Sequence, residues 1–400
     1  MISVENAKLA VIRNTRLLPV ENIPIENAYG YVLAEGLYSP LSLPPFNQSA
    51  MDGYAFIFDD FKNNLPIKII AEVAAGDFFK GSLKSGQAIR IFTGAPVPDG
   101  ADCIVMQEKV TIEKDCLQIH DSAIKQHANI RPAGSQIKKG ALALPKGTVL
   151  TAGAIGFIAG MGIANVIATR KPVVNVIVTG TELQKPGNFL EGGQIFESNS
   201  YSILAALKSI DISTENIQSV PDNEEEVTTI ISNSINSCDV LLLSGGISVG
   251  DYDFVERALK TIGVQTIFYK VKQKPGKPLF FGKYKNTLIF ALPGNPAAVL
   301  CCFYEYVFPA LQLMRGFDLS HLKSKSQIQL PIACNYSKKS GLSFFLKGKM
   351  SDNSVIPLEG QESYILSSFA IADCLIYLPE ETENVAKAEL VEVHKLPGSM

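Results

Sequence analysis

The sequence predicts an α/β multidomain protein built around one parallel sheet. The first observation is a strand, glycine turn and helix between residues 240 and 262. The second is the alternation of strand-like and helix-like segments around it, which is typical of parallel sheets with right-handed crossovers. The third is a β-rich pattern on both sides of this region. The predicted division is a segmented, helical N-terminal domain (residues 1–43 and 137–172), a β-rich inserted domain (44–136), an α/β domain (173–318) and a small C-terminal β domain (319–400).

The stretch VLLLSGGISVGDYD, residues 240–253, organises the α/β domain. The apolar residues 240–243 are too few for an ordinary helix and predict a strand that is buried on both faces. The two glycines that follow allow the backbone to approach a ligand closely. Apolar residues then recur at helical spacing from Phe254 to Ile262, before Gly263. A strand, glycine turn and helix in this order is the arrangement that binds anions in open α/β sheets.

The rest of the α/β domain alternates in the same way. Asp222 and Glu225 have the spacing of a capping pair at the start of a helix. The predicted strands are residues 173–179, 266–271, 279–282 and 287–292. The predicted helices are 198–210, which begins with the capping pair Ser198 and Asn199, then 224–235, and a last one that ends near residue 314.

The flanking domains have other patterns. Apolar positions among charges predict an amphipathic helix over residues 3–18, behind Ser3 as its cap, and further helices over 28–34 and 152–162. Short runs rich in β-branched residues, broken by glycine and proline, predict strands. These are residues 67–73, 87–92, 103–107 and 109–112 in the inserted domain, and 326–332, 342–347, 374–378 and 388–393 in the C-terminal domain.

Composition excludes several classes of protein. The net charge of −3, with no basic tract, gives no reason to expect nucleic acid as a partner. No apolar run approaches the roughly 18 residues of a membrane span, and the charged N-terminus is not a signal peptide, so we expect a cytoplasmic protein without a membrane partner. The seven cysteines contain no C-x-x-C pair, which disfavours a zinc site. Metalloprotease, serine hydrolase and P-loop signatures are also absent from the sequence.

Candidate functional residues follow the predicted strands of the parallel sheet, where loops converge at one edge. Glycine-rich backbone amides and lysines suit an anion such as phosphate, and carboxylates suit Mg²⁺ that bridges it. The segments concerned are TGTEL (residues 179–183), the segment around Asp222, SGGISVGDYD (244–253), KPGKP (274–278) and PGNP (293–296).

Simpler explanations stay open for each feature alone. A glycine turn after a strand is most often only a connection, and Asp222 serves equally well as a helix cap. Lys274 and Lys277 are about as well explained as solvated charges. In and just after the proline-rich loop PPFNQSAMDGYA, residues 44–55, we expect Met51, Tyr54 and Phe56 to belong to the core.

Several long motifs occur in one order along nearly the whole chain. They are PPFNQSAMDGYA, RIFTGAPVPDGAD (residues 90–102), IRPAG (130–134), TGTEL, GQIFESNS (193–200), SGGISVGDYDFV, KPGKP and LPGNP. In these motifs the chain resembles the molybdopterin molybdenumtransferases, that is, MoeA-like proteins and the gephyrin E domain. The resemblance implies a molybdopterin-binding α/β domain and a homodimer.

The implied activity is the insertion of molybdate into adenylylated molybdopterin, with Mg²⁺-dependent hydrolysis of the adenylate and release of AMP. By the resemblance, the catalytic residues are Asp52, Glu182, Asp222 and Asp253, and the Mg²⁺ ligands are Glu182, Asp222 and Asp253. The implied substrate-binding residues are Thr93, Gly245, Gly246, Ser248, Lys274, Lys277, Pro278, Gly294, Asn295, Ser367 and Ser368. A shared site is also expected, in which Asp52 of one subunit serves the α/β domain of its partner.

Four positions depart from the pattern of the family. Gln136 stands where an acidic residue is usual, Thr181 where aspartate is frequent, Ala298 where serine is usual and Lys347 where arginine is usual. These departures leave open a paralogue with altered metal use, tungstate for instance, or reduced activity. A scaffold of the gephyrin type and a generic nucleotide- or sugar-phosphate-binding enzyme are the remaining alternatives.

Overall fold

The structure is a computed structural model, and it describes residues 1–214, 216–247, 254–318, 320 and 327–397. The chain forms two compact units, each of which is described by itself. Unit 1 comprises Met1–Asn22, Gly30–Ala34 and Ile167–Met400, and unit 2 comprises Ile23–Tyr29 and Glu35–Val166. The boundaries of the four expected domains stay a prediction.

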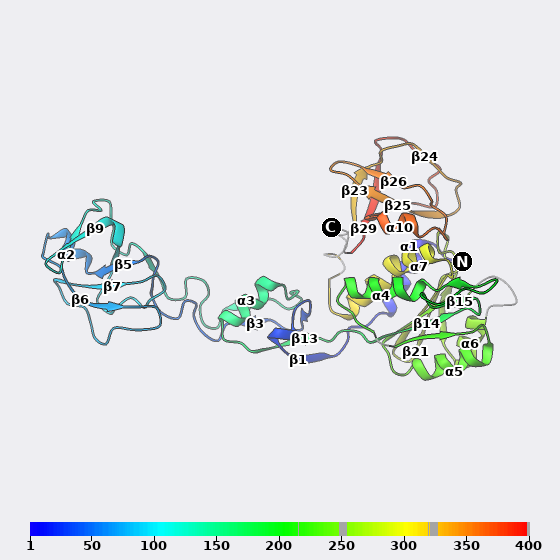
Figure 1. Ribbon diagram of the computed structural model, residues 1–400, viewed down its shortest axis with the longest axis horizontal. Coiled ribbons are helices and arrows are strands. Elements are labelled where there is room, and N and C mark those ends of the chain that lie inside the picture. The colour runs from blue at the N-terminus through cyan, green and yellow to red at the C-terminus, as the bar shows by residue number, and fades with distance from the viewer. Residues whose placement is uncertain (215, 248–253, 319, 321–326, 398–400) are drawn as a thin grey trace. The chain divides into compact units, whose positions relative to one another are not determined.

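A six-stranded sheet in the order β17-β14-β18-β22-β21-β19 forms the centre of unit 1 (Figure 1). The first four of these strands are parallel, as predicted, whereas β21 runs antiparallel to both of its neighbours, β22 and β19. Every residue of β14, β18 and β22 is buried. The strands are β14 (Val174–Thr179), β17 (Ile217–Val220), β18 (Val240–Ser244), β19 (Gln265–Tyr269), β21 (Phe280–Tyr284) and β22 (Thr287–Leu292).

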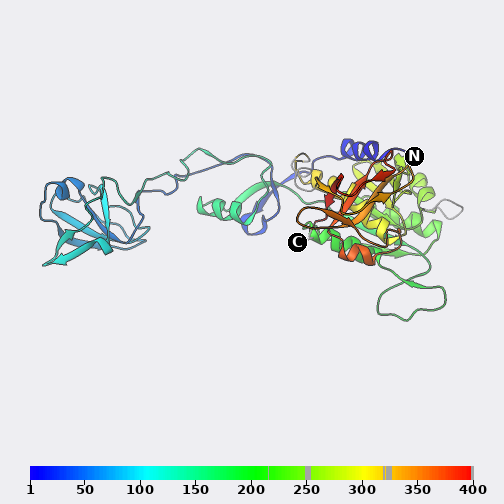
Figure 2. The same ribbon diagram turned by 90° about the horizontal axis from the view of Figure 1, so that it is seen from above.

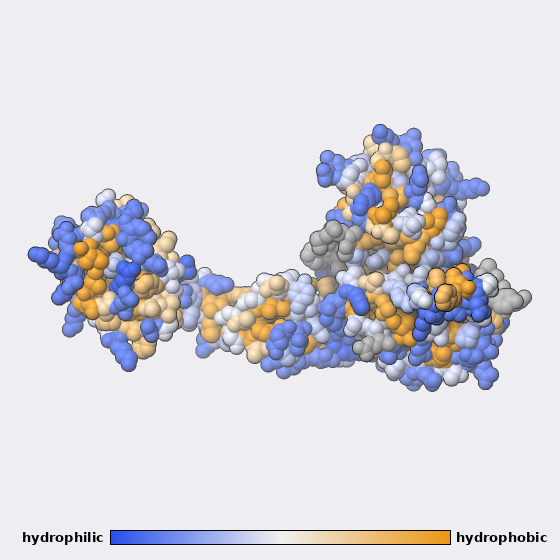
Figure 3. Space-filling view, viewed as in Figure 1, coloured by the Kyte–Doolittle hydropathy of each residue, from blue (hydrophilic) through white to orange (hydrophobic). Residues whose placement is uncertain are grey.

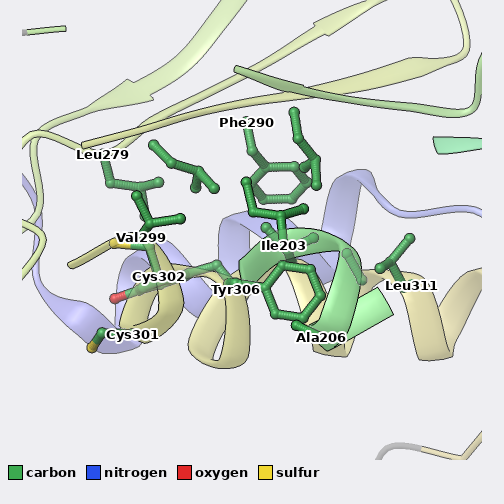
Figure 4. Close-up of a cluster of buried hydrophobic side chains, with 14 of the residues drawn as sticks. Ile203, Ala206, Leu279, Phe290, Val299, Cys301, Cys302, Tyr306 and Leu311 are labelled. Carbon is green, nitrogen blue, oxygen red and sulfur yellow. The ribbon is translucent and has the colours of Figure 1, made fainter. Parts of the chain in front are cut away.

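Helices cover both faces of this sheet (Figure 1). One face packs against α5 (Glu224–Ser234) and α6 (Phe254–Ile262). The other packs against α4 (Asn199–Ser209) and the run formed by α7 (Pro296–Cys302), η3 (Phe303–Val307) and α8 (Phe308–Met314). Figure 4 shows this second core, where Ile203, Phe290 and Tyr306 come together from three different elements.

The expectation that no apolar run approaches the length of a membrane span is wrong, because the helical run Pro296–Met314 is long and apolar enough to cross a membrane by length and composition. Most of it is buried inside unit 1, between the sheet and the surrounding helices. Burial in the core therefore accounts for its apolar composition.

The N-terminal helix α1 (Val4–Asn14) belongs to unit 1, and the hydroxyl of Ser3 caps it as expected. Val4, Ala7 and Val11 pack into the core that faces α4 and α7. Figure 2 shows α1, in blue, along the outside of this unit. The helix predicted over residues 28–34 is wrong. A short 3-10 helix, Ile25–Asn27, and strand β2 (Val32–Leu33) occupy this region, and Gly30 between them adopts a positive φ of 76°.

The C-terminal part of unit 1 forms a sheet in the order β20-β25-β27-β29-β23, with β26 beside β25. Its first strand, β20, comes from the α/β region, and it leads directly into the KPGKP loop. The C-terminal sheet and that loop are therefore joined. The strands are β20 (Gln273–Lys274), β23 (Gln327–Pro331), β25 (Ser343–Met350), β26 (Val355–Pro357), β27 (Cys374–Leu378) and β29 (Leu390–Lys395), and helix α10 (Ser367–Ile371) precedes β27.

A buried ionic network links α1, η3 and β29. Glu305 is 5% exposed, and its carboxylate accepts hydrogen bonds from Lys8 Nζ at 2.6 Å and from His394 Nδ1 at 2.7 Å. The other ring nitrogen of His394 lies 2.6 Å from the carboxylate of Glu392. Burial raises the pKa of Glu305, but the charges of His394 and Lys8 outweigh burial and lower it to about 2.

Unit 2 contains a six-stranded sheet in the order β8-β5-β7-β6-β10-β9, where the sequence predicts β structure. Tyr54 and Phe56 on β5 are buried in its core as expected, but Met51 is 42% exposed. Unit 2 also holds α3 (Ala152–Gly160), where a helix was predicted. The strands of the sheet are β5 (Gly53–Phe56), β6 (Lys68–Val73), β7 (Gln87–Ile91), β8 (Cys103–Met106), β9 (Val110–Glu113) and β10 (Cys116–Ile119).

Candidate active site

A cavity of about 840 Å³ lies at the carboxyl ends of the parallel strands of unit 1. The loops after β14, β17, β18 and β22 all contribute to its wall, together with the KPGKP loop. Of the predicted site residues, the structure brings nine together here: Glu182, Asp222, Gly245, Gly246, Lys274, Lys277, Pro278, Gly294 and Asn295.

The two positions after β18 require glycine, because the turn lies very close to neighbouring segments of the chain. Gly245 and Gly246 have positive φ values of 94° and 62°. A Cβ atom at Gly245 would lie 2.4 Å from the carbonyl oxygen of Thr179, and one at Gly246 would lie 2.7 Å from Val255. The turn therefore packs against the end of β14 and the side of α6, which explains why the sequence has no side chain at either position.

Two carboxylates line this cavity from neighbouring loops. Glu182 and Asp222 are both exposed, and the amide of Asp222 donates a hydrogen bond to the hydroxyl of Thr181 at 3.1 Å. Thr181, one of the departures, thus ties the two loops together. Asp222 is not the cap of α5 as the sequence suggested, because the side chain of Asn223 accepts the amides of Glu225 and Glu226.

The cations come from the KPGKP loop. Lys274 and Lys277 are exposed, and they line the same cavity as the two carboxylates. Within the described part of the chain, neither ammonium group forms an ion pair. The buried side chain of Gln273 fixes the conformation of this loop. Its amide group donates a hydrogen bond to the carbonyl of Pro275 at 3.0 Å and accepts one from the hydroxyl of Tyr306.

Asn199 begins α4, where the sequence predicts a capping residue but no contact with the loops of the cavity. Asn199 is 9% exposed, and its amide group donates to Ser244 Oγ at 3.0 Å and to the carbonyl of Gly294 at 2.8 Å. It therefore links the end of β18 to the PGNP loop. The cap predicted at Ser198 makes no side-chain bond, and Glu197 accepts from the amide and hydroxyl of Ser200 instead. The ESNS motif was the available signal for these residues.

The C-terminal part of unit 1 also reaches the cavity. Ser363 and Tyr364 lie in its wall, and Asn295 donates to the hydroxyl of Ser363 at 2.8 Å. The predicted residues Ser367 and Ser368 do not line the cavity. Ser367 is exposed, whereas Ser368 is buried and donates to the carbonyl of Gly360 at 2.8 Å. The predicted residues Ser248 and Asp253 lie outside the described residues.

Asp52 and Thr93 lie together in unit 2. The amide and the hydroxyl of Thr93 donate to the same carboxylate oxygen of Asp52, at 2.7 and 2.8 Å. Both hydrogen bonds lower the pKa of Asp52, which keeps this exposed carboxylate ionised. Gln136, the departure in this unit, is exposed, and its amide donates to the carbonyl of Leu43.

Among the described residues, no group of three or more His, Cys, Asp or Glu side chains is arranged to hold a metal ion. Glu182 and Asp222 are therefore two carboxylates in an open cavity and not a closed metal cage. Mg²⁺ is usually bound through one or two carboxylates, several waters and the phosphates of a substrate. The donor set fits such a substrate-bridged ion, and it does not fit a structural zinc site.

Known proteins resemble the chain over its full length. Residues 2–162 match the MoeA N-terminal region (domain I and II), 175–313 a probable molybdopterin binding domain and 329–396 the MoeA C-terminal region (domain IV). The molybdopterin molybdenumtransferase of Haemophilus influenzae is 33% identical over 378 residues, which is 93% of each chain. Molybdopterin molybdenumtransferase 2 of Mycobacterium tuberculosis is 30% identical and covers 99% of this chain and 100% of its own.

Solved structures agree with the sequence matches. A crystal structure of a molybdopterin biosynthesis MoeA protein from Pyrococcus horikoshii superposes with a TM-score of 0.84 at 29% identity, with 100% of both chains covered. A second structure of the MoeA protein from that organism gives 0.82 at 26% identity, with 99% of this chain and 100% of the other covered. The family matches, the relatives and the shared multidomain architecture together establish that this chain belongs to the molybdopterin molybdenumtransferase family of enzymes.

Proposed function

We propose that this chain inserts molybdate into adenylylated molybdopterin, with Mg²⁺-dependent hydrolysis of the adenylate and release of AMP. The observation that carries the proposal is one cavity of about 840 Å³ lined by two carboxylates, two lysines and glycine-rich turns. Both the lysines and the carboxylates suit a phosphorylated, negatively charged substrate. The lysines would bind its phosphate oxygens, and the carboxylates would hold the metal ion that bridges those oxygens. The relatives named molybdopterin molybdenumtransferase support the choice of substrate.

Glu182 and Asp222 are the residues that would hold Mg²⁺, and the family resemblance adds Asp253, which lies outside the described residues, as a third carboxylate. The ion would neutralise the charge that develops on the phosphate oxygens as the pyrophosphate bond breaks. The backbone amide of Gly246 would bind a phosphate oxygen, because a glycine turn lets the backbone approach an anion closely. The amide of Gly245 instead donates to the carbonyl of Leu292 at 3.4 Å, which ties the turn to the end of β22.

Lys274 and Lys277 would bind the oxyanion. Neither ammonium group forms an ion pair in the described part of the chain, although that of Lys274 lies 5.5 Å from the ring centroid of Phe344. Pro278, Gly294 and Asn295 shape the wall of the cavity beside the two lysines. The buried bond from Gln273 to the carbonyl of Pro275 fixes the loop that carries both lysines. Two cations held at a fixed spacing suit molybdate, a small dianion.

We also propose that the enzyme is a cytoplasmic homodimer in which Asp52 and Thr93 serve the same reaction. Exposed apolar side chains of the segment around β15 (Leu183–Gln184) and β16 (Ile195–Phe196) support a protein interface, since Phe189 is 97% and Ile195 is 54% exposed. Figure 3 shows hydrophobic surface over the position of β15.

The reaction is tested by incubating the purified chain with adenylylated molybdopterin, molybdate and Mg²⁺. We expect AMP and molybdenum cofactor to appear in equal amounts, and neither without Mg²⁺. Mixing inactive Asp52→Ala chains with inactive Glu182→Ala chains tests the dimer, because heterodimers contain one intact site if the two residues come from different subunits. Molybdenum insertion without AMP release would contradict the proposed reaction.

A further inference from the structure

The segment 358–366, between β26 and α10, builds one wall of the active-site cavity. Its Ser363 accepts a hydrogen bond from Asn295, and the carbonyl of Ser363 accepts the amide of Ala297 at 3.1 Å. Ser363 and Tyr364 therefore lie against the loop that begins α7. Any residue that fixes the conformation of this wall segment acts on the cavity from a distance.

Lys347 lies beneath the wall segment, on β25, and is only 2% exposed. Its ammonium group donates to the carbonyl oxygens of Gly360 at 2.6 Å, Ile365 at 2.9 Å and Glu362 at 3.2 Å. A lysine ammonium has three N–H donors. All three are used inside the wall segment, and none is left for a ligand.

Neighbouring bonds bind the same segment to β25. The amide of Lys347 donates to Gln361 Oε1 at 2.9 Å, and Gln361 Nε2 donates back to the carbonyl of Lys347 at 2.9 Å. Ser368 donates to the carbonyl of Gly360, which already accepts from Lys347. Burial lowers the pKa of Lys347, because desolvation disfavours its charged form. The three carbonyl oxygens that accept hydrogen bonds from the ammonium favour the charged form.

We propose that Lys347 is a positioning residue for the active site: it folds the wall segment 358–366 around its ammonium group and thereby places Ser363 and Tyr364, and it does not bind the oxyanion itself. This inference rests on the proposed function for the identity of the ligand. It also gives a physical reason for the lysine, where the family usually has arginine. A planar guanidinium with five donors does not match three carbonyls that converge on one point.

The substitution Lys347→Arg separates positioning from direct binding. If Lys347 were an oxyanion ligand, arginine would keep or strengthen binding, because its bidentate fork matches oxyanions better. If Lys347 positions the wall, arginine disturbs it as Lys347→Met does. We expect both variants to raise the molybdate concentration for half-maximal insertion by about ten- to a hundredfold, since small misplacements at an active site have effects of this order.

The second readout is amide hydrogen exchange of residues 358–366 in the protein without substrate. We expect exchange in this segment to accelerate at least tenfold in both variants, while α5 and α6 stay protected. Lys349→Met, two residues along the same strand at a lysine whose side chain is 56% exposed, is the matched control and should change neither readout. This readout does not depend on the proposed reaction, whose own failure would appear as a wild-type chain that releases no AMP.

Should Lys347→Met fail to fold, Ser363→Ala replaces it, because it removes the contact with Asn295 without touching the buried ammonium. We then expect a smaller rise in the molybdate requirement with the same acceleration of exchange near residue 363. Unchanged exchange in Lys347→Arg, together with an unchanged or lower molybdate requirement, would overturn the proposal and make residue 347 a direct ligand.

Discussion

Charged side chains of unit 1 occur in two contrasting settings. In the cavity at the strand ends, Lys274 and Lys277 are exposed and form no ion pair with the described residues. Between α1, η3 and β29, by contrast, Lys8, Glu305 and His394 are joined by hydrogen bonds of 2.6 and 2.7 Å. Charges that are already paired with one another have little left to offer a ligand, whereas unpaired charges at a cavity do.

The contrast assigns different tasks to the two settings. Removing one member of a buried pair leaves an uncompensated charge and destabilises the fold. Removing an exposed, unpaired charge has little effect on stability, because water already solvates it. We therefore expect substitutions in the cavity to change activity and substitutions in the buried network to change stability.

The largest effect is expected for Lys274→Ala combined with Lys277→Ala. A hydrogen bond to a charged group contributes about 1.5–3 kcal/mol, so each lysine should change molybdate affinity roughly ten- to a hundredfold. We expect the molybdate requirement of insertion to rise far more than the requirement for the pterin substrate. Lys260→Ala, at an exposed lysine of α6, is the control. Equal effects on both substrates would mean that the lysines bind the phosphates of the pterin.

Replacing Glu305 with glutamine should lower the free energy of unfolding by about 3–5 kcal/mol, since it leaves Lys8 and His394 without their shared carboxylate. Urea unfolding measures this loss. Glu72→Gln is the comparison, because Glu72 forms an exposed pair with Arg90 at 3.6 Å and should contribute at most about 1 kcal/mol. Similar losses of unfolding free energy in the two variants would show that the burial of Glu305 does not increase its contribution to stability.

The buried network also makes stability depend on pH. Burial lowers the pKa of His394, but Glu305 and Glu392 outweigh burial and raise it above its ordinary value of 6.5. A raised pKa contributes stability that is fully present below pH 6.5 and is lost as the pH rises through the folded value. For Glu305, whose pKa is lowered from 4.5 to about 2, the contribution is present above pH 4.5 and is lost as the pH falls toward 2.

We therefore expect the melting temperature of the wild type to decline on the alkaline side of pH 6.5, and His394→Gln to remove most of this decline. The exposed His120, which contacts Thr111, provides the control substitution His120→Gln. An unchanged alkaline slope in His394→Gln would assign the pH dependence to other groups.

The smallest effect distinguishes two neighbouring residues before α5. Asn223→Ala should cost about 1 kcal/mol of stability, because the amides of Glu225 and Glu226 lose their acceptor. Asp222→Asn should change stability by less than about 0.5 kcal/mol while slowing AMP release, since Asp222 faces the cavity. A clear loss of stability in Asp222→Asn would instead indicate that Asp222 acts as a cap of α5.

Local patterns predicted much of the α/β region. The strand at residues 240–243 and the helix from Phe254 to Ile262 are confirmed, because burial on both faces and helical spacing can be recognised from neighbouring residues. The helix expected at residues 28–34 is wrong because a short apolar run with a glycine fits a turn and a strand equally well. The cap of α5 was placed one residue early for a similar reason, since Asp222 and Asn223 are both good caps.

The contacts that hold the site were not predictable in the same way. Lys8 and Glu305 are 297 residues apart in the chain, and no spacing rule connects them. Lys347 likewise appears in the sequence only as a departure from the usual arginine, whereas its bonds to residues 360, 362 and 365 depend on the fold of the C-terminal sheet. Strand-end loops converge by topology and were predictable, but the packing beneath them was not.

The separation of tasks is tested most directly by measuring AMP release and urea unfolding on the same preparations of Lys274→Ala/Lys277→Ala and Glu305→Gln. We expect the lysine variant to unfold like the wild type and to release little AMP at wild-type molybdate concentrations. The Glu305 variant should unfold at lower urea concentration, and its folded fraction should release AMP at nearly the wild-type rate. A lysine variant that is active but unstable, or a Glu305 variant that is stable but inactive, would contradict this account.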